Sequence, residues 1–219
     1  MIDKRVPDLA AAVAGIRDGA TVLVAGFGMV GEPRELVEAL LPLGVRDLTI
    51  VANNAGSRDR GIARLILERR VRKVICSYPR STDPYAFEDA YKAGKIELEL
   101  VPQGTLSERI RAGGAGIGGF FTRTAAGTKL GDGKEQREID GELYVLEGPI
   151  KADVALLRAL KADRWGNLVY RKSARNFNPV MAMAGQLTVA QVAETVELGT
   201  LDPETIHTPG IFVDRVVVV

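Results

Sequence analysis

The sequence is poor in cysteine, histidine and aromatic residues. It contains one cysteine, Cys76, and one histidine, His207, and aromatic residues make up 5% of its 219 positions. A single cysteine excludes an internal disulfide framework and a cage of metal-binding thiolates, and it favours a reducing compartment. A lone histidine without a second cluster of ligand-type residues argues against a zinc site and against a Ser/His/Asp triad. Cys76 lies within the apolar run KVICS, which predicts a buried side chain.

The chain also lacks an excess of charge and a long hydrophobic run. Its 29 Lys and Arg residues are balanced by 28 Asp and Glu residues, for a formal net charge of +1. This balance argues against sequence-independent binding to nucleic acid, which needs clustered positive charge. The longest uncharged stretch near the N-terminus, residues 19–31, falls short of the roughly 20 apolar residues that span a bilayer. We expect a cytoplasmic protein with no targeting segment and no membrane partner.

What the sequence does have is a regular alternation of apolar runs. Hydrophobic residues make up 46% of the chain, and a chain of this length buries about 70% of its unfolded surface. Short β-branched runs alternate with segments of helical period, which predicts an α/β fold with a mostly parallel sheet flanked by helices. No repeat or linker divides the sequence, so we expect one domain over residues 1–219.

The positions of these elements follow from the same pattern. We expect helices over residues 7–16, 33–41, 61–70, 84–93, 106–112 and 188–196. We expect strands over residues 21–25, 47–52, 73–77, 97–101, 154–159, 168–170 and 211–219. A glycine-rich loop region occupies residues 113–133, and a β-hairpin insertion follows over 137–149, where Asp140-Gly141 is a turn signal.

One glycine motif follows the first predicted strand and precedes a helix. Its residues are Gly26, Phe27, Gly28, Met29, Val30 and Gly31. The spacing G-x-G-x-x-G fits a dinucleotide site, a tight turn without ligand, or a site for another phosphorylated ligand. A dinucleotide site needs an acidic residue after the second strand, where this chain has Asn53 and Asn54, and Glu32-Pro33 follows the last glycine at once. A site for another phosphorylated ligand is therefore favoured over a nicotinamide or flavin site.

The residues around this motif resemble a known family. Residues 18–33, DGATVLVAGFGMVGEP, resemble the N-terminal signature of class I CoA transferases, in which Gly-Gly-Phe leads to Gly-x-Pro. Ala25 replaces the first glycine of that pair, which bears on how closely backbone and ligand approach. The resemblance continues through VANNAG (51–56), PQGTL (102–106), ERIRAGG (108–114) and RKSARNF (171–177). The resemblance covers nearly the whole chain, which is most similar to the α subunit of CoA transferases of the 3-oxoacid type.

Further segments are most similar to the branch of this family that acts on 3-oxoadipate. They are ICSYPR (75–80), KEQREIDG (134–141), DRWGNL (163–168), LDPE (201–204) and TPGIFV (208–213). The resemblance implies transfer of CoA from succinyl-CoA to a 3-oxo acid, with 3-oxoadipate in aromatic catabolism as the expected acceptor and acetoacetate as the alternative. A nucleotide-binding module and a mere assembly scaffold are the two other hypotheses.

The resemblance also implies how the work is divided. The family's nucleophilic glutamate, which forms an acyl anhydride and then a glutamyl-CoA thioester, belongs to a companion β subunit, so this chain should be inactive alone. Two α and two β chains are expected to form a heterotetramer. No cofactor is expected to be bound permanently, since coenzyme A and succinyl-CoA are substrates, and the glycine loop is expected to contact CoA. The family's oxyanion glutamine matches Gln103.

Other polar residues allow more than one interpretation. Asn53 and Asn54 could hydrogen-bond substrate, but Asn before Ala-Gly is also a turn former. For Glu32 we expect a solvated acid at a helix N-terminus, and we assign it no catalytic role. Candidate anion-binding residues are Arg171, Lys172, Arg175, Arg80, Arg109 and Arg123, although any one of them is more often part of a solvated surface.

Overall fold

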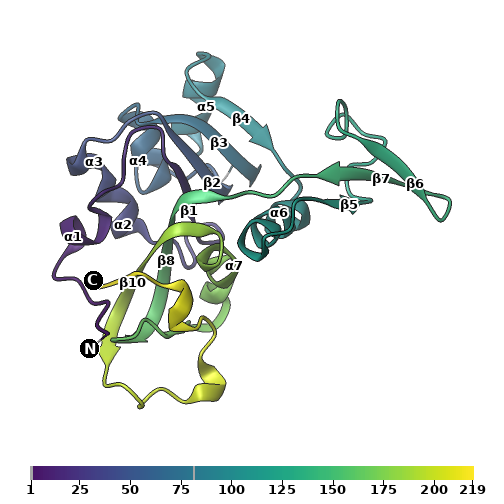
Figure 1. Cartoon of the computed structure of the whole chain (residues 1–219). Helices are drawn as coiled ribbons and strands as arrows, with labels where there is room; N and C mark the ends of the chain where they lie inside the picture. Colours follow the sequence, from purple (N-terminus) through teal and green to yellow (C-terminus); the bar gives the residue numbers. More distant parts are fainter. Residues whose placement is uncertain (1, 81) are drawn as a thin grey trace.

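The computed structural model describes residues 2–80 and 82–219, and a large sheet runs through its centre (Figure 1). In the described residues eight strands form this sheet in the order β11-β10-β8-β1-β2-β3-β4, with β9 beside β8. Every pairing is parallel except that of β9. The strands are β1 (Thr21–Val24), β2 (Leu48–Asn54), β3 (Val71–Tyr78), β4 (Glu97–Leu100), β8 (Ala152–Asp163), β9 (Leu168–Val169), β10 (Gly185–Val196) and β11 (Arg215–Val218). The predicted α/β class is confirmed.

Helices cover both faces of the sheet. They are α1 (Leu9–Val13), α2 (Arg34–Glu38), α3 (Leu40–Leu43), α4 (Ile62–Leu67), α5 (Tyr85–Lys92), α6 (Gln103–Ala115) and α7 (Asn178–Ala182). Short 3₁₀ turns lie at η1 (Lys172–Arg175), η2 (Pro203–Thr205) and η3 (Gly210–Phe212). No helix in the described part of the chain is long and apolar enough to cross a membrane.

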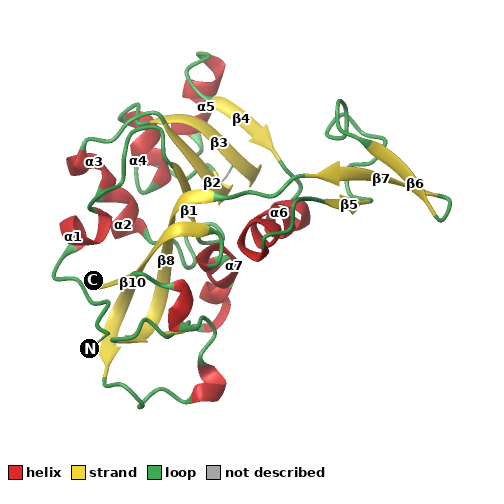
Figure 2. Ribbon diagram, viewed as in Figure 1, coloured by secondary structure: helices red, strands yellow, loops and turns green. Residues whose placement is uncertain are grey.

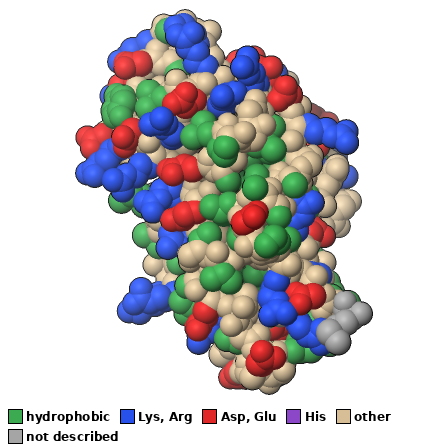
Figure 3. All heavy atoms as spheres, turned by 90° about the vertical axis from the view of Figure 1, so that its left-hand side faces the viewer, with side chains coloured by type: hydrophobic (Ala, Val, Ile, Leu, Met, Phe, Trp, Pro, Cys, Tyr) green, Lys and Arg blue, Asp and Glu red, His purple; other side chains and the backbone are tan. Residues whose placement is uncertain are grey.

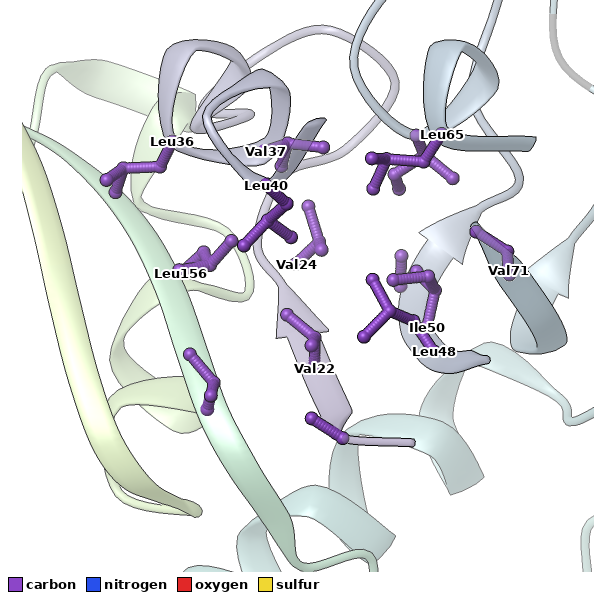
Figure 4. Packing of buried hydrophobic residues seen from close by; sticks show 14 of the residues in the cluster. Val22, Val24, Leu36, Val37, Leu40, Leu48, Ile50, Leu65, Val71 and Leu156 are labelled. Atoms are coloured by element: carbon purple, nitrogen blue, oxygen red, sulfur yellow. The ribbon is translucent and has the colours of Figure 1, made fainter. Parts of the chain in front are cut away.

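Alternate residues of the strands supply two separate hydrophobic cores. Val22 and Val24 of β1 point to the core that contains Leu36 and Leu40 (Figure 4), whereas Leu23 between them joins the core beneath α6 and α7. This is the period-2 geometry of a strand that is buried on both faces. The surface, unlike these cores, carries many charged side chains. Figure 3 shows basic and acidic side chains interspersed on one face of the described residues, which agrees with the near-zero net charge.

A small antiparallel sheet projects from the main body (Figure 2). It contains β5 (Phe120–Thr122), β7 (Glu142–Glu147) and β6 (Gln136–Ile139), in that order. The predicted hairpin is present, and its turn residues Asp140 and Gly141 have φ of 52° and 76°. Two consecutive positive φ values are typical of the two-residue turn that Asp-Gly favours.

One predicted helix is wrong. Residues 188–196 belong to β10, which lies between β8 and β11. Val189, Val192 and Val196 have helical spacing, but a strand with neighbours on both sides and apolar contacts on both faces shows no clear alternation. The β-branched residues of this run are the signal that favoured a strand. Residues 211–219 are also only partly strand, because η3 precedes β11.

Candidate functional site

The polar residues of interest meet at one edge of the sheet. Strands β1, β2, β3 and β4 are neighbours and parallel, so their carboxyl ends lie side by side. The glycine loop 26–31 follows β1, Asn53 and Asn54 end β2, Tyr78 ends β3, and Gln103 opens α6 shortly after β4. The carboxyl edge of a parallel sheet is where α/β proteins bind ligands. The helix predicted to begin at residue 106 begins at Gln103 itself.

A cavity of about 730 Å³ lies at this edge. Five of its lining residues were predicted from the sequence. They are Gln103 as the catalytic donor, Phe27 and Gly28 of the glycine loop, and Asn53 and Asn54 as substrate-binding residues. The rest of the described lining is Ser77, Tyr78, Arg80 and Thr82. Of these, only Arg80 was predicted from the sequence, as a candidate anion-binding residue. The other three lie in the last two residues of β3 or soon after it, and this position at a strand end could have indicated them.

Three side chains in this cavity form a hydrogen-bond network. Gln103 Nε2 donates to Asn53 Oδ1 at 2.7 Å. Ser77 Oγ donates to the same oxygen at 2.7 Å and also lies 3.1 Å from the main-chain oxygen of Asn53. Asn53 is 4% exposed, whereas Gln103 is exposed. The Asn53 oxygen is thus used twice, which fixes the orientation of its amide and brings two amide groups together at the cavity wall.

The second asparagine has a local structural role. Asn54 Oδ1 accepts a hydrogen bond of 2.9 Å from the backbone N–H of Gly56. This is the turn-forming geometry that Asn before Ala-Gly favours. Asn53 therefore belongs to the side-chain network and Asn54 forms the turn, while both residues line the cavity.

The glycine loop forms a small hairpin. Phe27 and Val30 exchange backbone hydrogen bonds of 3.0 and 3.1 Å, and α2 begins only at Arg34, three residues after Gly31. Gly31 has φ of 75°, and a Cβ there would lie 2.5 Å from the carbonyl oxygen of Ala174. A dinucleotide turn instead leads directly into a helix whose first N–H groups face the phosphates. The loop presents apolar side chains, since Phe27 is 52% and Met29 is 70% exposed.

Comparison with known proteins identifies the family. Residues 6–219 match the coenzyme A transferase family. This chain belongs to that family. It is 59% identical to one subunit of the 3-oxoadipate CoA-transferase of Pseudomonas putida, over 100% of this chain and 95% of the relative. It is 53% identical to one subunit of the succinyl-CoA:3-ketoacid coenzyme A transferase of Xanthomonas campestris, over 98% of this chain and 88% of the relative. The resemblance seen in the motifs is confirmed.

A solved CoA transferase has the same fold. Acyl-CoA transferase YdiF of Escherichia coli O157:H7, in a thioester complex with CoA, matches 100% of this chain with a TM-score of 0.85 and 26% identity. The match covers 47% of the YdiF chain, so this CoA transferase chain spans about half of that longer protein.

The expectation for Glu32 is wrong. Its side chain is not solvated: it is partly buried at the start of α4, against Gly61, where the backbone N–H of Ile62 donates to it. Burial raises the pKa of Glu32 to about 7, since removal of a carboxylate from water disfavours its charged form. Arg34 opposes this shift, and Glu38 and Glu35 add to it. The carboxyl group is therefore partly protonated near neutral pH.

Replacement of Glu32 by glutamine is expected to stabilise the transferase chain in a pH-dependent way. Because the folded-state pKa of about 7 exceeds the ordinary value of 4.5, protonated Glu32 contributes stability that is complete below pH 4.5 and lost as the pH rises through 7. The neutral variant should gain about 2 to 3 kcal/mol of unfolding free energy at pH 8 and almost nothing at pH 4.5. Urea unfolding at pH 8 and at pH 4.5 measures this gain, with Glu138→Gln, at an exposed position, as the control. A gain of equal size at the two pH values would contradict the prediction.

Two candidate arginines pair with acids outside the cavity. Arg109 is 14% exposed and contacts Glu99 at 2.8 Å and Glu147 at 3.8 Å, and its Nε donates to the carbonyl oxygen of Gly148 at 2.8 Å. Arg123 pairs with Glu142 on the projecting sheet at 2.8 Å. These two arginines connect elements of the fold and do not line the cavity that holds Gln103.

Two basic residues of the predicted cluster at 171–175 line another hollow. Arg171 and Lys172 line a space of about 390 Å³ together with Arg158, Met29 and Val30. Arg171 and Lys172 thus border the outer part of the glycine loop and not the cavity with the amide network, and Arg175 lines neither space.

Cys76 is buried, as the sequence predicts. Burial raises the pKa of its thiol to about 12. The thiolate is the reactive form of cysteine, so Cys76 is no nucleophile at neutral pH.

Proposed function

We propose that this chain is the α subunit of a two-subunit CoA transferase that moves CoA from succinyl-CoA to 3-oxoadipate. The observation that carries the proposal is the composition of the cavity at the sheet edge. Its described lining holds amide and hydroxyl donors and one cation, but no carboxylate. Such a lining can stabilise a negative charge but holds no glutamate that could act as the nucleophile. In this proposal a second chain therefore brings the nucleophile to it.

Gln103 is the donor for the oxyanion in this proposal. When the partner's glutamate attacks the thioester carbonyl, negative charge develops on the carbonyl oxygen, and collapse of the intermediate releases CoA as a thiolate and leaves an anhydride. Gln103 Nε2 uses one hydrogen for Asn53 and keeps the other for this oxyanion. A preorganised donor of this kind is worth roughly 3 to 4 kcal/mol in the transition state. Asn53 orients Gln103 through the same hydrogen bond.

The glycine loop and the partner complete the site. Exposed Phe27 and Met29 offer apolar contacts to the pantetheine arm of CoA or to the partner chain. Both relatives are named as single subunits of their enzymes, and YdiF is about twice as long as this chain, which supports a companion β subunit. We propose a heterotetramer of two α and two β chains, located in the cytoplasm, with CoA as substrate and no permanent cofactor.

The acceptor acid separates two versions of this proposal. The relatives with 58–59% identity are named for 3-oxoadipate, and those with 51–53% identity are named for 3-ketoacids. The test is a CoA-transfer assay with succinyl-CoA on the complex of this chain and its β subunit. A higher kcat/KM for 3-oxoadipate than for acetoacetate supports the proposal, preference for acetoacetate changes the substrate, and turnover of neither acid by an assembled complex contradicts the function.

A nucleotide-binding module is the second candidate, and the spacing of the glycine motif is what favours it. The hairpin geometry of the loop argues against it, because the N–H groups of Phe27 and Val30 are used within the loop. Fluorescence titration of the chain with NADH and with CoA distinguishes the two, since saturable NADH binding would favour the second candidate.

A further inference from the structure

We propose that Arg80 binds the second carboxylate of dicarboxylate substrates and so makes the site selective for 3-oxoadipate over acetoacetate. This inference rests on the proposed function and names the residue that sets its substrate class. Arg80 is the only charged side chain among the described residues that line the cavity of Gln103 and Asn53. It lies just beyond the end of β3, in the same cavity as the amide network.

The contacts of Arg80 anchor it and leave it accessible. Its Nε donates to Glu88 Oε1 of α5 at 2.7 Å. The Arg80 side chain is 73% exposed, whereas that of Glu88 is 22% exposed and is also 3.3 Å from Lys92 Nζ. Glu88 thus has two cationic partners, and the Arg80 side chain makes no other hydrogen bond to the residues that the structure describes. A guanidinium held at Nε still has its outer N–H groups for a bidentate contact with a carboxylate.

The other cations near the site are placed differently. Arg109 is nearly buried between two glutamates and a carbonyl oxygen. Arg58 pairs with Asp83 at 3.1 Å and lines a smaller recess next to the cavity. Arg171 and Lys172 line the hollow beside the outer part of the glycine loop. None of these four shares the cavity with Gln103, so Arg80 is the cation that a ligand held by Gln103 would meet.

The chemistry of the substrates fits one accessible arginine. Succinyl-CoA and 3-oxoadipate each carry a free carboxylate at the end remote from the reacting group, whereas acetoacetate ends in a methyl group. The remote carboxylate of 3-oxoadipate lies two carbons further out than that of succinate. An exposed arginine on a flexible stem can follow this difference, while a rigid buried one could not. Arg80 therefore suits both half-reactions of a transfer between two dicarboxylates.

The test is the acceptor preference of the assembled transferase with Arg80→Met, which keeps the apolar stem and removes the charge. In a ping-pong reaction, kcat/KM for the acceptor reports only the half-reaction with that acceptor. We expect kcat/KM to fall about 10- to 100-fold for 3-oxoadipate, as for loss of a charged hydrogen bond, and less than about twofold for acetoacetate. Arg80→Lys should recover only part of the loss. Arg123→Met, an exposed arginine with one glutamate partner, is the matched control.

Three results with the assembled transferase would overturn the proposal. Equal losses with both acids, or weaker binding of free CoA by Arg80→Met, would give Arg80 a general or a CoA-binding role. Unchanged kcat/KM for 3-oxoadipate would show that Arg80 takes no part in recognition of this acid.

If the assembled wild type transfers CoA to neither acid, the proposed function fails, and calorimetric binding of succinate and butyrate decides the role of Arg80. Weaker succinate binding with unchanged butyrate binding supports it, and unchanged succinate binding contradicts it.

Discussion

Replacing Gln103 by alanine is expected to lower kcat of the assembled transferase about a hundredfold without changing its assembly. The variant removes the donor that lies 2.7 Å from Asn53 Oδ1 in the cavity at the sheet edge. Loss of one preorganised oxyanion donor costs roughly 10²- to 10³-fold in kcat, because water in its place must reorganise as charge develops. Gln103 is exposed and opens a helix, so its truncation leaves the fold intact. Steady-state kinetics with size-exclusion chromatography measures both quantities.

Gln186→Ala is the matched control for this variant, since Gln186 is an exposed glutamine on β10, away from the cavity. It should retain the kcat of the wild type. If Gln103→Ala keeps full turnover in an assembled complex, Gln103 has no part in the mechanism. The chain would then fit the assembly-scaffold hypothesis better.

Gly113→Ala is expected to be the most damaging small substitution in the helix that carries Gln103. An added Cβ would overlap the carbonyl oxygen of Ile150, and the neighbouring Gly114 packs closely on Met183. The backbone N–H of Ile150 also donates to the carbonyl oxygen of Arg109 at 2.8 Å, so α6 cannot move away without loss of that bond. Overpacking normally costs about 1 to 3 kcal/mol, and a clash with backbone should exceed this. We expect a loss of at least about 3 kcal/mol in urea unfolding.

The same helix offers an opposite control. Apart from its chain neighbours and the backbone of its own helix, Gly104 has no heavy atom of the described residues within 4 Å of the position of an added Cβ. Gly104→Ala should therefore raise the free energy of unfolding by about 0.5 to 1 kcal/mol, since alanine loses less backbone entropy in a helix. Equal effects of the two substitutions would show that the close contact at Ile150 does not constrain α6.

The convergence of Gln103 and Asn53 could be predicted because both positions follow from the topology. Each residue comes at the end of a predicted parallel strand or just after it, and such ends share one edge of the sheet. Ser77 lies at the corresponding end of β3, but it belongs to no sequence motif that would have marked it as part of the site. Its hydrogen bonds to Asn53 depend on the register between β2 and β3. Register is set by tertiary packing that one sequence does not display.

The arginines show where sequence reasoning fails. Arg80 and Arg109 looked equivalent in sequence, but Arg109 is almost enclosed by Glu99 and Glu147 while Arg80 faces a cavity. These environments arise from partners that come from other elements of the fold. Glu32 was misjudged for a similar reason, because its burial comes from the start of α4 at Gly61, which is distant along the chain.

The division of labour between the two chains is tested most directly by intact-mass spectrometry of the assembled complex after incubation with succinyl-CoA. A glutamyl-CoA thioester adds the mass of CoA, less water, to the chain that carries the nucleophile. The account predicts this adduct on the companion β chain and none on this chain, whose cavity lining contains no carboxylate among the described residues. An adduct on this chain, with Glu32 as the buried carboxyl group beside the glycine loop, would contradict it.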